Sequence, residues 1–164
     1  MRTSVFQPVL AVALVGLACK GPDDTSSGAT KFHATLTGGA EVPAVNPSGG
    51  ATATFELNGD QLTYTVTITA PVTDSVRQAH IHLAAAGSNG GISVWLCDSA
   101  TNPSPDPVTP ACALGTSAGV LATGTTAAPA ATVSAMRAFG AYANVHTKTN
   151  GGGEIRGQII PEAP

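Results

Sequence analysis

The hairpin signature in residues 51–70 constrains the fold of this chain more than any other stretch. ATATFEL and QLTYTVTITA alternate apolar and polar residues, and Asn58-Gly59-Asp60 separates them. Alternation with a period of two predicts strands that bury one face, and Asn-Gly supplies the left-handed conformations that a tight hairpin turn needs. In the second strand, threonines take one face and four apolar residues take the other: Leu62, Tyr64, Val66 and Ile68. These residues predict an antiparallel pair with its apolar face in a core.

Short strand signals also fill most of the remaining chain. We expect strands at residues 31–37, 79–84, 92–97, 119–123, 141–147 and 154–160, and one short helix at 132–139. Gly 19 and Pro 12 favour many turns, and because only 4% of residues are aromatic, the core has to be built from small aliphatic side chains. Helices do not alternate with the strands as a parallel sheet would require. The sequence predicts one all-β domain over residues 31–162, an antiparallel β-sandwich or barrel of about eight short strands with one short helix.

The N-terminal residues have the character of an export signal. Arg2 precedes an apolar run at residues 9–18, which is too short to span a bilayer as a helix. Gly16-Leu17-Ala18-Cys19 resembles a bacterial lipobox, which predicts a lipoprotein signal peptide at 1–18 and a lipid-carrying Cys19; an ordinary signal peptide is the alternative. Residues 19–30 are polar and predict a flexible tether. We expect the protein in the cell envelope, lipid-anchored and facing the periplasm or the exterior.

Two cysteines remain after Cys19, namely Cys97 and Cys112. An even number in an oxidising compartment predicts a disulfide, and the four prolines between them exclude a regular strand or helix. A bridge around a loop of this size contributes about 3 kcal/mol in the chain-entropy model. Two unpaired buried thiols are the alternative.

The charged residues exclude several functional classes. The net charge is −3, and the seven basic residues form no cluster, so we expect no nucleic-acid partner and contact with a membrane only through the lipid anchor. The sequence has no Gly-x-Ser-x-Gly elbow and no His-Glu-x-x-His helix. The carboxylates are few and widely separated, so no catalytic residues can be named.

His80 and His82 are two apart in a predicted strand and therefore point the same way. If the strand at 141–147 lies nearby with its polar face on the same side, His146 joins them, and three imidazoles are a recurrent ligand set for zinc or copper. Asn144, Glu154 and Arg156 would then surround and orient the rings. A solvated polar strand face and a buried hydrogen-bonding feature are the alternatives.

Three ordered motifs resemble the CHRD (chordin) domain. The closing stretch AYANVHTKTNGGGEIRGQII is similar to the family's end, LTGGAEVPAV at 36–45 to its beginning, and AHIH at 79–82 with NGG at 89–91 to its centre. The family's Gly-Pro after the second histidine is Leu83-Ala84 here, and its proline in the final turn is Gly151 or Gly152. The resemblance covers about residues 32–161. It implies the fold and an extracytoplasmic location; the animal protein chordin binds growth factors, but that partner does not carry over to a bacterial lipoprotein.

Two functions follow from these observations. The first is a membrane-anchored extracytoplasmic binding or structural module of the CHRD type, without evident catalytic activity, whose partner is an unknown protein or surface ligand. The alternative is a copper- or zinc-binding redox protein that uses the three histidines. His-x-His in one strand and a later histidine from another strand are similar to the copper side of copper-zinc superoxide dismutase, also an antiparallel sandwich.

Overall fold

The computed structural model describes residues 28–46, 49–101, 103–113 and 115–163. The expected signal peptide, Cys19 and most of the expected tether lie outside these residues. Near the start of the described residues, Ala29 is buried, and the carbonyl of Thr30 accepts a hydrogen bond from the amide of Leu57. Within the described part of the chain, no helix is long and apolar enough to cross a membrane.

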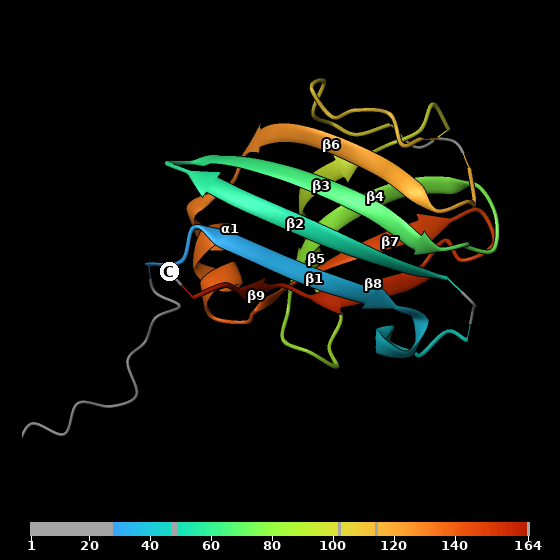
Figure 1. Ribbon diagram of the computed structural model, residues 1–164, viewed down its shortest axis with the longest axis horizontal. Helices are drawn as coiled ribbons and strands as arrows, with labels where there is room; N and C mark the ends of the chain where they lie inside the picture. The colour runs from blue at the N-terminus through green and yellow to red at the C-terminus, as the bar shows by residue number, and fades with distance from the viewer. Residues whose placement is uncertain (1–27, 47–48, 102, 114, 164) are drawn as a thin grey trace, which may run out of the picture.

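The fold is a single antiparallel sheet of nine strands with one α-helix, which confirms the predicted all-β class. The strand order is β5-β4-β7-β8-β1-β2-β3-β6, and β9 pairs with β1. Figure 1 shows β6, β3, β2 and β1 in the near wall and β4, β5 and β7 in the far wall. The strands are β1 (Lys31–Thr37), β2 (Gly50–Asn58), β3 (Gln61–Ala70), β4 (Val76–Leu83), β5 (Gly91–Cys97), β6 (Gly119–Ala127), β7 (Ala141–Thr147), β8 (Ile155–Gln158) and β9 (Ile160–Pro161). A 3-10 turn, η2 (Gly38–Ala40), follows β1.

Strands β2 and β3 form the predicted hairpin. Phe55 faces Tyr64 and Ala53 faces Val66 across the pair. Leu62, Tyr64, Val66 and Ile68 are buried, as the alternation predicts. The Tyr64 hydroxyl donates to the carbonyl of Leu96 at 2.8 Å, so a side chain from β3 crosses the interior and satisfies a backbone group of β5.

The sheet curves until its edge strands β5 and β6 approach each other, and a short segment helps to close the seam. The amide of Cys112 donates to the carbonyl of Asp98 just after β5, and the amide of Ala113 donates to Leu121 of β6. Cys97 and Cys112 form the predicted disulfide at the same place. The bridge therefore holds the proline-rich excursion against the seam of a nearly closed barrel.

Helix α1 (Ala130–Arg137) covers one end of the barrel and begins two residues before the predicted start. Pro129 precedes the helix with a φ of −53°, which suits the position before a first turn. Met136 and Thr132 are buried, and the Thr132 hydroxyl lies 2.5 Å from the Ser93 hydroxyl of β5. The helix thus packs on the core and also contacts an edge strand.

Strand β7 differs from the others because all seven of its residues are buried. Its apolar side chains, Ala141, Ala143 and Val145, belong to the barrel core. Its other face carries Tyr142, Asn144 and His146. An antiparallel strand with both faces buried needs a cover on its outer side, and this cover, formed by loops, creates the candidate site.

Candidate metal centre

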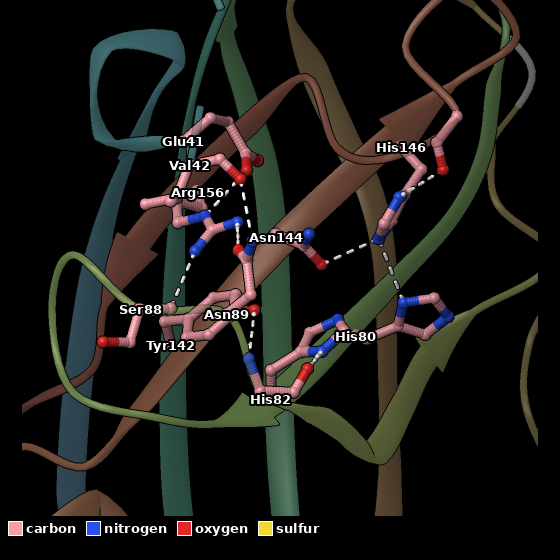
Figure 2. Close-up of polar contacts among 12 residues, drawn as sticks. Glu41, Val42, His80, His82, Ser88, Asn89, Tyr142, Asn144, His146 and Arg156 are labelled. Carbon is pink, nitrogen blue, oxygen red and sulfur yellow. Dashed lines mark hydrogen bonds and ion pairs between the residues drawn. The ribbon is translucent and has the colours of Figure 1, made fainter. Parts of the chain in front are cut away.

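His80, His82 and His146 converge on the outer face of the barrel wall. The strand pairing places Gln78 of β4 opposite His146 of β7 and His80 opposite Asn144, so the three rings are neighbours on one face. One nitrogen from each ring lies within 4.8 Å of the others, and the exposed fractions of the residues are 0%, 7% and 6% in sequence order. Figure 2 shows the rings directed toward one another. The structure brings the three residues together as strand geometry predicts; that they bind a metal stays a prediction.

Backbone carbonyls orient two of the rings. His82 Nδ1 lies 2.9 Å from the carbonyl oxygen of Gly90, and His146 Nδ1 lies 3.0 Å from that of Gly151. A carbonyl only accepts, so each Nδ1 carries the proton and donates it. Each Nε2 is then left with a lone pair directed away from the loop, which is the arrangement that positions an imidazole as a metal ligand.

Two ring nitrogens of the cluster lack a hydrogen-bond partner in the described part of the chain. His80 Nδ1 and His146 Nε2 are 3.2 Å apart. His80 Nε2 and His82 Nε2 are buried, and they have no hydrogen-bond partner among the described residues. Buried polar atoms without a partner are rare and costly in folded proteins. The unpartnered Nε2 of His82, beside the close pair of His80 and His146, indicates that an additional group completes the cluster.

The surroundings keep the imidazoles neutral. Burial lowers the pKa of His80 to about 2, with a smaller contribution from the neighbouring rings His146 and His82. Burial also lowers the pKa of His146 to about 4, against an opposing effect of the hydrogen bond to Gly151. The pKa of His82 is lowered for the same main reason. All three rings therefore have the protonation state that metal coordination requires.

Asn144 lies beside the rings. Its Oδ1 is 3.0 Å from His146 Nε2, and it also acts on His82, whose pKa it raises against the effect of burial. The residue is only 2% exposed. Asn144 therefore lies near the histidines, as expected. It faces Nε2 of His146, whereas Nδ1, the nitrogen that an orienting group would bind, is bound to Gly151.

Arg156 contacts the cluster through Tyr142. Its guanidinium lies over the Tyr142 ring, 4.3 Å from the centroid, and the Tyr142 ring stacks on His82 with centroids 4.9 Å apart and an interplanar angle of 4°. A cation over an aromatic face is attracted by the negative face of the ring. The stack of Arg156, Tyr142 and His82 fixes the plane of the His82 ring from the side opposite the cluster.

The same arginine holds the two loops that cover the site. Arg156 Nε donates to Glu41 Oε2 at 2.7 Å in a buried ion pair, and its other nitrogens donate to the Ser88 carbonyl and to Asn89 Oδ1. Asn89 in turn donates to the carbonyl of Val42. Figure 2 shows this network beside the rings. Because Gly90 follows Asn89 directly, the network also sets the position of the carbonyl that binds His82.

Glu154 lies away from the rings, and the expectation that it orients them is wrong. Its carboxylate accepts hydrogen bonds from the amide and hydroxyl of Thr73 and from the side chains of Thr147 and Asn150. Strand β8 begins only at Ile155, and Gly153 before it has a φ of 127°. This bend ends the alternation that would have placed Glu154 on the face of Arg156, so Glu154 ties the β7–β8 turn to the segment after β3.

Trp95 of β5 packs on the cluster from the edge of the sheet. It is opposite His80 in the strand pairing, and the two rings meet edge to face with centroids 4.3 Å apart. No pattern in the sequence assigns Trp95 to the site. Its indole shields His80 and places an intrinsic fluorophore, the single tryptophan of the chain, against a candidate ligand.

The sequence profile of the CHRD domain family matches residues 32–159, which is most of the chain. The chain belongs to the CHRD domain family. This match confirms the resemblance carried by the opening, central and closing motifs. No curated protein and no solved structure matches the chain.

The CHRD motifs contain the site residues that alternation did not single out. Glu41 belongs to the opening motif, Asn89 and Gly90 belong to the NGG of the central motif, and Tyr142 begins the closing one. Strand periodicity cannot show that these loops fold over the histidines. The sequence signal for these residues was their membership of the three CHRD motifs. In a domain of this size, the three motifs are expected to lie near one another.

Proposed function

We propose that this CHRD domain is an extracytoplasmic metal-binding module that holds one copper or zinc ion through His80, His82 and His146. The observation that supports it is the cluster of three neutral, buried imidazoles with ligand nitrogens within 4.8 Å of one another. Imidazole nitrogen suits both zinc and copper, and two of the rings already have their Nδ1 protons bound to carbonyls.

The burial of the cluster favours holding an ion over turning over a substrate. The three histidines are at most 7% exposed, and Trp95, Tyr142 and two loops surround them. A catalytic metal keeps a coordination position that substrate can reach, whereas a structural or storage site is closed. The superoxide-dismutase-like alternative requires such an open position, so we place the binding module ahead of it.

Anchoring is the second part of the proposal. The apolar run at residues 9–18 and the lipobox-like Gly16-Leu17-Ala18-Cys19 support export followed by lipid attachment at Cys19. Intact-mass analysis of the mature membrane-associated protein should give a lipidated Cys19 as the first residue. Cys19→Ser should release a folded domain, and a mature chain that begins elsewhere without lipid would refute the anchor.

Metal uptake tests the site directly. The purified domain should bind about one equivalent of Zn²⁺ or Cu²⁺, and Cu²⁺ should quench the fluorescence of Trp95 because the indole lies against His80. His80→Ala and His146→Ala should each lose stoichiometric uptake. The control is His33→Ala, since His33 is exposed on β1 and lies 3.5 Å from Glu162, away from the cluster. Failure of the unmodified domain to take up either metal, or equal loss in the His33 variant, would contradict the proposal.

A further inference from the structure

The amide of Asn144 faces His146 in an arrangement that a hydrogen bond does not explain. His146 donates its Nδ1 proton to Gly151, so its Nε2 is an acceptor. Asn144 Oδ1, also an acceptor, lies only 3.0 Å from that Nε2. Two lone pairs directed at each other at this distance repel, unless the amide is reversed or a cation lies between them.

The neighbours of Asn144 oppose the reversed amide. Asn144 Nδ2 is on the side of Glu41, because a Cβ placed on Gly153 would lie 3.0 Å from Nδ2 and 2.6 Å from Glu41 Oε1. Glu41 Oε1 is buried and has no hydrogen-bond partner among the described residues, while Oε2 is bound to Arg156. Reversal would turn the amide oxygen toward this carboxylate, where two acceptors would repel, so Glu41 keeps Oδ1 on the side of the rings.

Given the proposed metal site, we infer that Asn144 Oδ1 is the fourth ligand and that Glu41 is the residue that positions it. The distances between donor atoms support this assignment. His80 Nδ1 is 3.2 Å and Asn144 Oδ1 is 3.0 Å from His146 Nε2. Ligand atoms about 2.0–2.1 Å from a tetrahedral ion are about 3.3 Å apart. The ligand nitrogen of His82 lies within 4.8 Å of those of the other two histidines, so three nitrogens and one oxygen would complete a tetrahedral set that leaves no position for water.

This assignment separates the centre from an open three-histidine site. With Asn144 as a ligand, every donor is neutral and protein-derived, so the ion is held without a bound water to activate. Glu41, 5% exposed and paired with Arg156, connects the ligand to the loop network. The opening motif of the chain therefore contributes to the metal site through one carboxylate.

Water access to a bound ion tests the assignment. In the Cu²⁺-loaded protein, the ion should not enhance the relaxation of solvent water protons. Asn144→Ala should still bind Cu²⁺ through the histidines, with affinity about 10- to 100-fold lower, and should gain relaxation enhancement because water takes the fourth position. Asn144→Asp, which keeps an oxygen, should exclude water again, and Glu41→Gln should show intermediate water access.

The test of Asn144 has its own control, and its failure can be distinguished from failure of the three-histidine site. Asn150→Ala removes a half-buried turn amide that donates to Glu154, not to the rings, and should leave water access unchanged. If the unmodified domain binds Cu²⁺ with a coordinated water, or if Asn144→Ala changes neither affinity nor water access, Asn144 is not a ligand although the histidine site stands. If the unmodified domain binds no metal, the proposed function fails first.

Discussion

At the scale of single residues, protonation of the histidines links metal-free stability to pH. The pKa of His146 is lowered by burial to about 4, and that of His80 to about 2, whereas an unfolded histidine titrates near 6.5. Between these values, the unfolded chain binds protons that the folded chain does not. The contribution of these histidines to the free energy of unfolding is therefore complete above pH 6.5 and decreases as the pH falls below that value.

The metal-free domain should accordingly lose stability from pH 7 to pH 4.5. One histidine contributes a slope of about 1.4 kcal/mol per pH unit in this window, and a second buried histidine adds to it. Urea unfolding in the presence of a chelator at several pH values measures the slope. His33→Gln should keep the slope, because His33 is exposed, and a flat profile in the unmodified domain would show that the rings are not held neutral.

The ion pair between Arg156 and Glu41 is the other residue-scale feature with a measurable consequence. Its side chains are 6% and 3% exposed, against 62% and 65% for the pair of Lys31 and Glu56 on the surface. Removing one member of a buried pair leaves an uncompensated charge and costs about 3–5 kcal/mol, whereas an exposed pair contributes about 0–1 kcal/mol.

Arg156→Met should therefore lower the free energy of unfolding by about 3 kcal/mol or more, and Lys31→Met by less than about 1 kcal/mol. Chemical denaturation of both variants gives the comparison. Equal losses would mean that the Arg156 network does not stabilise the loops that cover the rings.

At the scale of elements, the site depends on how closely the β4–β5 loop approaches β4. A Cβ on Gly90 would lie 2.1 Å from the carbonyl oxygen of Leu83, whereas a Cβ on Gly91 would have no atom within 4 Å. Only glycine permits this approach at residue 90. The carbonyl of Gly90 is also the group that orients His82.

Gly90→Ala should displace this carbonyl and weaken metal binding about 10- to 100-fold, the effect of losing a partner that orients a ligand. Gly91→Ala, one residue further along, should leave binding unchanged. Calorimetric titration with Zn²⁺ and circular dichroism of both variants separate a loss of binding from a loss of fold. Equal affinity in the two variants would show that the loop does not position the ring.

The strands of this fold could be predicted from the sequence, whereas the loops over the site could not. The β2–β3 hairpin follows from local signals, namely alternation and an Asn-Gly turn, and the two strands pair as an antiparallel hairpin as expected. Convergence of His80, His82 and His146 required only the period of a strand and the assumption that the strands are neighbours. The carbonyls of Gly90 and Gly151 and the true position of Glu154 depend on loop conformations, and side-chain patterns do not encode those.

At the scale of the whole molecule, the disulfide holds the seam of the barrel. Cys97 ends β5, and Cys112 lies in the segment that bridges toward β6, with 15 residues of sequence separation. Away from this seam, antiparallel pairing is continuous from β5 through β4, β7, β8, β1, β2 and β3 to β6. The bridge is thus an additional constraint on a fold that already has its core.

Cys97→Ser with Cys112→Ser should lower the melting temperature while keeping the far-ultraviolet circular dichroism of the domain. A loop of this length corresponds to about 3 kcal/mol. Reductant should shift the melting temperature of the unmodified domain similarly and should not affect the double variant. Loss of the β-sheet signal on reduction would show that the seam is required for folding.

The wide sequence separation within the site has a consequence for the order in which it can form. Glu41 and Arg156 are 115 residues apart, and His80 and His146 are 66 apart. The chain is synthesised from its N-terminus, so His80 and His82 emerge as a pair before His146 and Arg156 exist. Only the last hairpin, β7 with β8, adds the third ring and draws the loops over it. An ion bound as proposed would therefore be selected where and when the C-terminal residues fold, from the metals present in that compartment.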